Sequence, residues 1–310
     1  MEMNYADIGM KVIGVIVLLI VVLFLLTWGG MVNCGDIPYW CDIYETVLGA
    51  PRVLIVYGDS GLGNPEELKL IMQDPNMVGA NTVDMAHLDT VSLGNLKRYK
   101  LVIVEQARQI NMEQLEMFMN YVNFNGGRLV WVGDAGVEKG INELENLMDV
   151  NKGTQLLDNA WARAKETETE YLTLNFDEFL GLRYVANYCE EKTCQENKFS
   201  VGIIKSELTG DHPLIYGSSP ALELRIQPPD RDFAIVKQFP NASNSNIVLT
   251  LDQGSVIQGK ENLLQRYLPL IATSGIGERV AYYAYPVEYF VKDNNYTIYV
   301  KNMYYGMLGK

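Results

Sequence analysis

Ser60 occupies a position typical of a nucleophile, in the turn Gly58-Asp59-Ser60-Gly61 that directly follows an apolar run. A serine hydroxyl attacks only when a base accepts its proton, and the usual base is a histidine that an acid orients. Asp84 and His87 have the local spacing of such an acid–histidine pair. The residues therefore allow a serine hydrolase, although a glycine turn capped by Asp59 and Ser60 is the more common use of this pattern.

Acidic side chains also follow two further predicted strands, at Glu105 and Asp134. Ligands of open parallel sheets bind in the crevice at the carboxyl ends of the strands. Asp59, Asp134 and Glu105 could share a cation there, but acids in turns are more often solvated, and we expect no metal. With His212, which precedes a proline, the candidate residues of this crevice are Asp59, Ser60, Glu105, Asp134 and His212.

The glycines of the same segment allow a phosphate site at the start of a helix that Pro65 opens. Gly58, Gly61 and Gly63 match neither the GxGxxG pattern nor a P-loop with its lysine. Pro65 also removes one backbone donor. We therefore expect no nucleotide and no other cofactor.

The elements that would position these residues alternate between strands and helices over 51–150. Short apolar runs rich in branched residues predict strands at 52–57, 81–86, 100–105 and 128–132. Helices are predicted at 66–73 and at 112–124, the second capped by Asn111. This pattern predicts an α/β fold with a flavodoxin-like or Rossmann-like parallel sheet covered on both faces.

The second half is predicted to be rich in β-strands. Its expected strands are 184–188, 199–204, 221–226, 233–238, 247–251 and 279–285, and the segment 261–271 is predicted to be helical. The predicted organisation is an N-terminal tail (1–11), a transmembrane helix (12–32), a linker (33–50), one α/β domain (51–290) and a C-terminal segment (291–310).

The order of several motifs resembles the class I glutamine amidotransferase-like superfamily, especially its non-catalytic ThuA-like branch. These motifs are Asn125-Gly-Gly-Arg-Leu-Val130, Gly133-Asp-Ala-Gly136, His212-Pro213 before Gly217, and Gly277-Glu-Arg-Val-Ala-Tyr282. The resemblance covers roughly 51–290. Catalytic members of that superfamily place a cysteine nucleophile at the turn equivalent to the one after 128–132, but here that turn contains no cysteine. The resemblance therefore predicts a degenerate domain without amide transfer, because neither Asp nor Ala replaces a thiolate.

A second resemblance competes with the first. Esterases of the SGNH type carry a Gly-Asp-Ser nucleophile after the first strand of a flavodoxin-like sheet, as Gly58-Asp59-Ser60 does here. Those enzymes place the acid–histidine pair near the C-terminus, whereas Asp84 and His87 follow the second predicted strand. The esterase interpretation is kept as an alternative.

The apolar run 12–28 contains no charge and extends with few polar residues to Val32. About 20 such residues can cross a hydrocarbon core, so we predict a single transmembrane helix over 12–32. A cleaved signal peptide is the alternative, although its apolar region is usually about 7–15 residues long. Lys11 is the only basic residue next to the run, and by the positive-inside rule it predicts an extracytoplasmic C-terminal domain.

Four cysteines fall in two close pairs, and we expect disulfides Cys34–Cys41 and Cys189–Cys194, with free thiols as the alternative. Asn241 and Asn295 begin two glycosylation sequons. The formal net charge of −13 argues against a nucleic-acid partner.

These observations predict a membrane-anchored, non-enzymatic binding or assembly module at the cell membrane. Its expected partner is an envelope protein or a glycan. The alternatives are a cell-surface serine hydrolase that uses Ser60 and a structural subunit of a membrane complex.

Overall fold

The computed structural model describes residues 5–28, 32, 37, 40, 43, 47, 52–80, 82–145, 147–149, 154–155, 157, 159–191, 197–202, 212–215, 222–226, 232–239, 245–252, 267–291 and 297–308. Contacts between Cα atoms divide the chain into two units. The first unit is Met1–Ala50 with Gly309–Lys310, and the second is Pro51–Leu308.

The first unit contains the helix α1 (Tyr5–Trp28). Near its end, Trp40 Nε1 donates a hydrogen bond to Thr27 Oγ1 at 2.9 Å. The ring of Trp40 also meets the ring of Phe24 edge to face, with the centroids 4.8 Å apart.

The prediction of a transmembrane helix over 12–32 is wrong. No helix within the described residues combines the length and the apolar character needed to cross a membrane. α1 ends at Trp28, before the predicted end at Val32, so the charge-free part of the helix runs only from Val12 to Trp28. A hydrocarbon core needs about 20 apolar residues.

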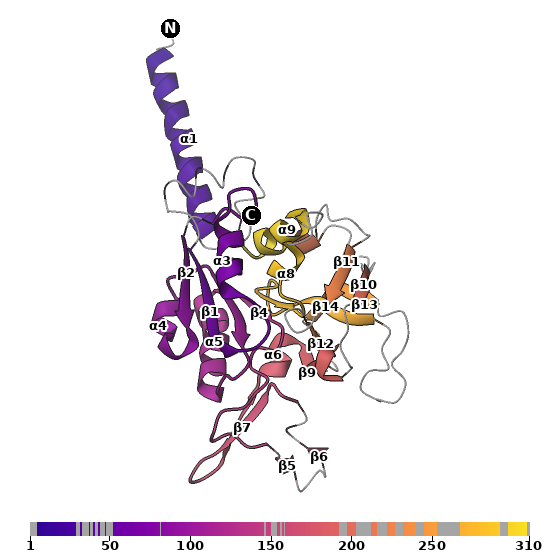
Figure 1. The fold of residues 1–310 in the computed structure, drawn as a ribbon. Coiled ribbons are helices and arrows are strands. Elements are labelled where there is room, and N and C mark those ends of the chain that lie inside the picture. Colours follow the sequence, from indigo (N-terminus) through magenta and orange to yellow (C-terminus); the bar gives the residue numbers. More distant parts are fainter. Residues whose placement is uncertain are drawn as a thin grey trace. The chain divides into compact units, whose positions relative to one another are not determined.

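A nine-stranded sheet forms the centre of the second unit, in the order β11-β10-β13-β14-β15-β4-β3-β1-β2 (Figure 1). Its parallel part contains β1 (Arg52–Ser60), β2 (Thr82–His87), β3 (Leu101–Ala107), β4 (Arg128–Val132) and β15 (Val280–Tyr283). The spatial order β2-β1-β3-β4-β15 is that of a flavodoxin-like sheet. The α/β class with a parallel sheet is thus confirmed.

Helices pack on both faces of this sheet (Figure 1). One layer contains α3 (Pro65–Gln73), α8 (Glu288–Val291) and α9 (Thr297–Leu308), and the other contains α4 (Leu93–Leu96), α5 (Met112–Asn125) and α6 (Phe176–Leu180). Because both faces are covered, the parallel strands are apolar along most of their length. The middle of β1 and almost all of β3 are buried.

Antiparallel strands extend the sheet beyond β15. They are β14 (Tyr267–Ser274), β13 (Ser245–Asp252), β10 (Asn197–Gly202) and β11 (Leu222–Ile226). The predicted helix 261–271 is wrong where the structure describes it, because β14 occupies 267–271. β14 is buried on both faces between β13 and β15.

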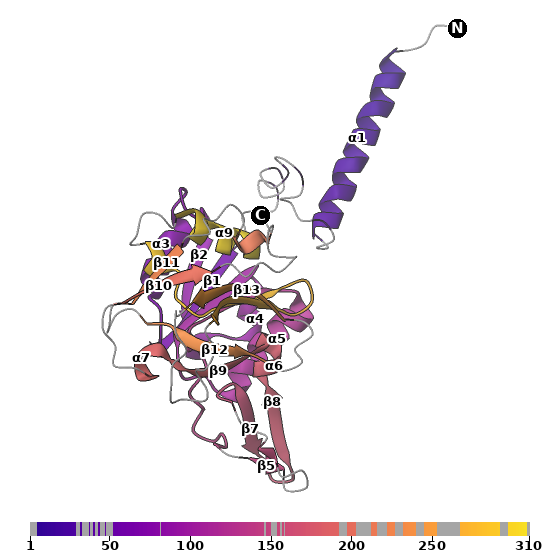
Figure 2. The same cartoon turned by 90° about the vertical axis from the view of Figure 1, so that its right-hand side faces the viewer.

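Two further strand pairs lie outside the main sheet. β9 (Leu182–Asn187) pairs with β12 (Ala234–Gln238). The short helix α7 (Tyr188–Glu191) directly follows β9. β7 (Ala162–Glu166) and β8 (Tyr171–Asn175) form a hairpin that projects from the rest of this unit (Figure 2). β5 (Met148–Asp149) and β6 (Thr154–Gln155) form a third, two-residue pair.

Cys189 is disulfide-bonded, and its partner lies outside the described residues. The other predicted disulfide residues, Cys34, Cys41 and Cys194, also lie outside them, as do the sequon residues Asn241 and Asn295. These pairings and modifications stay predictions.

Candidate functional site

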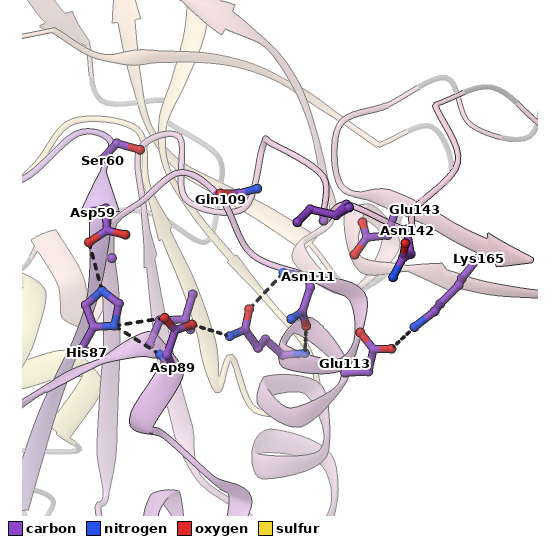
Figure 3. A pocket seen from close by; sticks show the side chains of 15 residues that line it. Asp59, Ser60, His87, Asp89, Gln109, Asn111, Glu113, Asn142, Glu143 and Lys165 are labelled. Atoms are coloured by element: carbon purple, nitrogen blue, oxygen red, sulfur yellow. Dashed lines mark hydrogen bonds and ion pairs between the residues drawn. The ribbon is translucent and has the colours of Figure 1, made fainter.

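A pocket of about 430 Å³ lies where β1 and β2 end, next to the start of α5 (Figure 3). Parallel strands end at one edge of a sheet, so the turns after them meet there. Gly58, Asp59 and Ser60 come from the end of β1, and His87 ends β2. We call it the His87 pocket, and its other lining residues are Leu88, Asp89, Gln109, Asn111, Glu113, Gln114, Gly140, Ile141, Asn142, Glu143 and Lys165.

His87 lies between two carboxylates in this pocket (Figure 3). Its Nε2 is 3.3 Å from Asp59 Oδ1, and its Nδ1 accepts a hydrogen bond from the backbone N–H of Asp89 at 3.4 Å. The carboxylate oxygen Oδ2 of Asp89 is 3.6 Å from the same Nδ1. Since Nδ1 accepts, the neutral tautomer that fits these contacts carries its proton on Nε2, which donates a hydrogen bond to Asp59.

This arrangement leaves Ser60 without a base. Both ring nitrogens of His87 are engaged by aspartates, whereas a nucleophilic serine needs a nitrogen free to accept its proton. Figure 3 shows the Ser60 hydroxyl beyond Asp59, directed away from the ring. Asp84, the predicted acid of the pair, instead accepts a hydrogen bond from the hydroxyl of Tyr99 at 2.8 Å.

The start of α5 supplies amide groups to the pocket. Asn111 caps the helix by accepting from the Gln114 N–H, while the Gln114 side chain accepts from the Asn111 N–H. The Gln114 amide also reaches Asp89 Oδ1 at 3.5 Å. This network fixes the rotamers of the polar groups on this wall.

Two ion pairs connect the pocket to the β7–β8 hairpin. Lys165 from β7 lies 2.6 Å from Glu113. Arg163 is fully buried, and its Nε lies 3.1 Å from a carboxylate oxygen of Glu143, whose other oxygen accepts from the Met112 N–H. Burial lowers the pKa of Arg163 to about 10, against the opposing effect of Glu143. These contacts hold the hairpin against the first turn of α5.

The first residue of the turn after β4, Gly133, has no space for a side chain and therefore cannot be replaced by a nucleophile such as cysteine. Gly133 has φ +59°, the left-handed conformation that glycine tolerates best. A β-carbon at Gly133 would lie 2.9 Å from the β-carbon of Leu62. The next residue that could do chemistry at this turn is Asp134.

Asp134 is 1% exposed and its carboxylate is engaged from three directions. Oδ1 accepts from the Leu62 N–H at 2.7 Å, and Oδ2 accepts from Asn187 Nδ2 at 2.8 Å and from Arg108 Nη1 at 3.1 Å. Arg108 also contacts Glu138 and Glu190. Asp134 therefore joins three segments as a structural acceptor and lies outside the His87 pocket.

Glu105 and His212 also lie outside the His87 pocket. Glu105 is fully buried under the turn that follows β1. His212 donates from Nε2 to Glu278 Oε2 at 2.9 Å while its Nδ1 accepts from the Leu214 N–H. Glu278 precedes β15, at the edge of the parallel sheet opposite the pocket. Of the predicted crevice residues, the pocket thus contains only Asp59 and Ser60.

Acid should weaken the fold through Glu278. The hydrogen bond from His212 lowers the pKa of Glu278 to about 2, against its partial burial and with help from Asn246 and Thr273. Because the native state binds this proton less tightly, the stabilisation is complete above about pH 4.5 and is lost as pH falls towards 2. In urea unfolding between pH 6 and pH 2, Glu278→Gln should lose less unfolding free energy on acidification than wild type does. Glu116→Gln, on the exposed side of α5, should lose as much as wild type. Equal acid sensitivity in all three proteins would contradict this.

Sequence reasoning missed the pocket residues that come from later segments. Asp89 follows β2 within a short helical turn (Leu88–Thr90), Glu143 lies in the loop after β4, and Lys165 lies on an unpredicted hairpin. The one available signal was Asn111, whose cap was predicted and whose side chain faces the pocket.

No protein-family model matches the chain, and no curated protein matches it. Among solved structures, a protein described as ThuA-like from Bacteroides uniformis is 15% identical, with a TM-score of 0.53, and the match covers 83% of this chain and 92% of that chain. A second ThuA-like protein, from Parabacteroides merdae, is 13% identical with a TM-score of 0.43, over 84% of this chain and 91% of that chain. At such identities a likeness concerns the fold alone. Over the part of the chain that it covers, the likeness to the protein from Bacteroides uniformis supports a ThuA-like fold.

Proposed function

We propose that this chain is a non-enzymatic binding module whose His87 pocket takes a glycan, either neutral or carrying amino groups. The observation that carries this proposal is the pair of exposed carboxylates at the mouth of the pocket. The side chains of Asp59 and Asp89 are 96% and 76% exposed and flank His87.

The charge balance of the pocket supports an uncharged or cationic ligand. Glu113 is paired with Lys165, and Glu143 is paired with Arg163. Among the described residues, His87 is the one basic side chain paired with Asp59 and Asp89. An incoming phosphate or carboxylate would therefore be repelled by the remaining negative charge. The same two aspartates can accept hydrogen bonds from sugar hydroxyls or from an ammonium group.

The amides of the pocket suit the same ligand. Gln109 and Asn142 are exposed and line the pocket, and each offers both a donor and an acceptor. A hydroxyl also donates and accepts, so a sugar edge can pair with amides and carboxylates together. Side chains fixed before binding lose less entropy when the ligand arrives, and the Asn111–Gln114 cap fixes one wall.

Calorimetric titration of the full chain with a panel of neutral and amino oligosaccharides tests the proposal. Asp89→Asn should raise the Kd of a bound glycan by about 10- to 100-fold, because a hydrogen bond to a charged group contributes about 1.5–3 kcal/mol. Glu116→Gln removes a charge outside the pocket and should leave the Kd unchanged. Absence of binding across the panel, or equal Kd values in both variants, would refute the glycan proposal.

The non-enzymatic part has its own test. A fluorophosphonate labels serines that a base activates, and the geometry around His87 provides no such activation for Ser60. The purified chain should therefore stay unlabelled. Labelling that disappears in Ser60→Ala would replace the binding proposal with a hydrolase.

A further inference from the structure

A buried carboxyl group with no hydrogen-bond partner lies on the opposite face of the sheet from Trp131. Glu105 is 0% exposed, and neither of its carboxyl oxygens has a hydrogen-bond partner among the described residues. An isolated ionised carboxylate in such surroundings would cost many kcal/mol, so the group must be neutral or must have a counter-ion.

The strand register shows what shares this face. In the pairing of β3 with β4, Val104 lies beside Trp131. In the pairing of β4 with β15, Val132 lies beside Tyr283. Glu105 therefore points to the same side as Tyr283, beneath α8 and α9. The Tyr283 hydroxyl donates to the Met303 carbonyl of α9, and the buried Tyr304 ring meets the Tyr283 ring edge to face.

A second buried carboxyl group, on α8, contacts the same turn that covers Glu105. Glu288 of α8 is 0% exposed and accepts a hydrogen bond from the Asn64 N–H at 2.7 Å. The neighbouring Gly63 has φ +120°, and a β-carbon there would lie 3.1 Å from Glu105 Oε2. The Gly63 N–H donates to the Tyr289 hydroxyl of α8 at 3.2 Å. Two side chains of α8 thus accept hydrogen bonds from backbone N–H groups of the turn between β1 and α3, and this turn lies directly over Glu105.

The two carboxyl groups differ in what they can accept. Glu288 receives a backbone N–H, which favours its ionised form, while Glu105 receives none, which favours its neutral form. The titratable groups that face Glu105 in the described part of the chain are Glu288 and Tyr289 of α8, Tyr304 of α9, Tyr283 of β15 and Tyr57 of β1. Each of these is acidic, so within that part no cation compensates a charge on Glu105.

We propose that Glu105 holds a proton in the native state beside ionised Glu288, and that loss of this proton releases the turn Gly61–Asn64 from α8. Two negative charges under one turn repel each other. In the described part of the chain, the hydrogen bonds that attach the turn to α8 are those from the Gly63 and Asn64 N–H groups. Glu105 lines neither the His87 pocket nor two other cavities found among the described residues, so a proton fits its surroundings better than a larger ligand does. Burial, followed by repulsion from Glu288, accordingly raises the pKa of Glu105 well above its usual value.

The sign of the pH effect follows from this proton. Because the native state binds it more tightly than the unfolded chain does, the native state is favoured at low pH. The folding equilibrium constant then falls about tenfold per pH unit between the ordinary pKa of glutamate and the raised value. Asp232 adds to this fall below about pH 6, because burial raises its pKa to about 6, so the comparison needs a matched variant.

Glu105→Gln keeps the size of the side chain and cannot ionise. Urea unfolding of the full chain from pH 5 to 9 should show the fall in wild type and in Asp232→Asn, and a flatter profile in Glu105→Gln. In wild type and in Asp232→Asn, the hydrogen-exchange rates of the Gly63 and Asn64 amides should rise by more than the intrinsic tenfold per pH unit, whereas in Glu105→Gln they should rise only by that factor. Parallel profiles in wild type and Glu105→Gln would overturn the proposal.

Glu288→Gln provides the second test, since its amide oxygen still accepts from Asn64. Removal of the neighbouring charge should lower the pKa of Glu105, so the fall in stability should end at a lower pH than in wild type. If the pH dependence of stability in Glu288→Gln were the same as in wild type, the proposed repulsion between Glu105 and Glu288 would be contradicted. Stabilisation of wild type by millimolar Mg²⁺ or Ca²⁺ that Glu105→Gln abolishes would also overturn the proposal, because it would identify a metal ion in place of the proton.

Discussion

Asp134→Ala is expected to reduce the free energy of unfolding by about 3–5 kcal/mol. The substitution leaves the Leu62 N–H and the Asn187 amide without the carboxylate that accepts from them. Each unpaired buried donor costs about 1–3 kcal/mol. Arg108 loses one partner as well, although Glu138 and Glu190 still hold it.

Urea denaturation of the full chain measures this loss, and two variants calibrate it. Asp134→Asn keeps an oxygen that can accept from Leu62 but places an NH₂ group where Oδ2 accepted, so it should lose less than the alanine variant. Glu138→Ala removes another partner of Arg108, but the Glu138 side chain is 53% exposed. Exposed ion pairs contribute about 1 kcal/mol or less. If Glu138→Ala were as damaging as Asp134→Ala, the burial of Asp134 would not be the cause.

Trp131→Ala should have an effect of similar size, about 3–5 kcal/mol, because it opens a cavity in the core. Trp131 is 0% exposed and lies between Phe118 of α5 and Phe176 of α6, with ring centroids 5.6 and 4.6 Å away. Its Nε1 donates to the Ala135 carbonyl, which Trp161 also reaches. That carbonyl keeps a partner in the variant, so most of the loss comes from packing.

Two aromatic controls separate these contributions. Trp131→Phe keeps a ring between the two helices and should lose less than half as much as the alanine variant. Phe124→Ala removes an aromatic side chain that is 81% exposed at the end of α5 and should change stability by no more than about 0.5 kcal/mol. Thermal or urea unfolding gives both values, and similar losses at Phe124 and Trp131 would contradict the cavity argument.

The parallel half of the fold could be predicted because its signals are local. The strand β1 is a continuous apolar run that ends in a glycine turn, and α5 has both a capping residue and a left-handed glycine, Gly126, after its last turn. Such features depend on neighbours within a few residues. The wrong helix over 261–271 shows the limit, since a short buried apolar run such as β14 cannot be told from a helix by periodicity alone.

The candidate site could be predicted only where strand ends determined it. Asp59 and Ser60 are the last two residues of β1, so their place at the sheet edge was determined by the strand. Lys165 reaches the same pocket from a hairpin about a hundred residues later, through a contact with Glu113 that no spacing encodes. Glu105 was predicted as a crevice residue, but its neighbour Glu288 lies far along the chain and was found only through α8.

The position of β15 bears on how the chain is made. β15 lies between β4 and β14 and pairs with β4 in parallel, yet about 150 residues separate the two strands in the sequence. At about 5–20 residues per second, a ribosome needs roughly 8–30 s to synthesise that interval. Until β15 has been made, the backbone N–H and C=O groups that β4 will pair with β15 lack that partner, and such an unpaired edge promotes aggregation. The nascent chain should therefore depend on chaperones until β15 emerges, and folding of the complete chain should be slow because this contact is so distant in sequence.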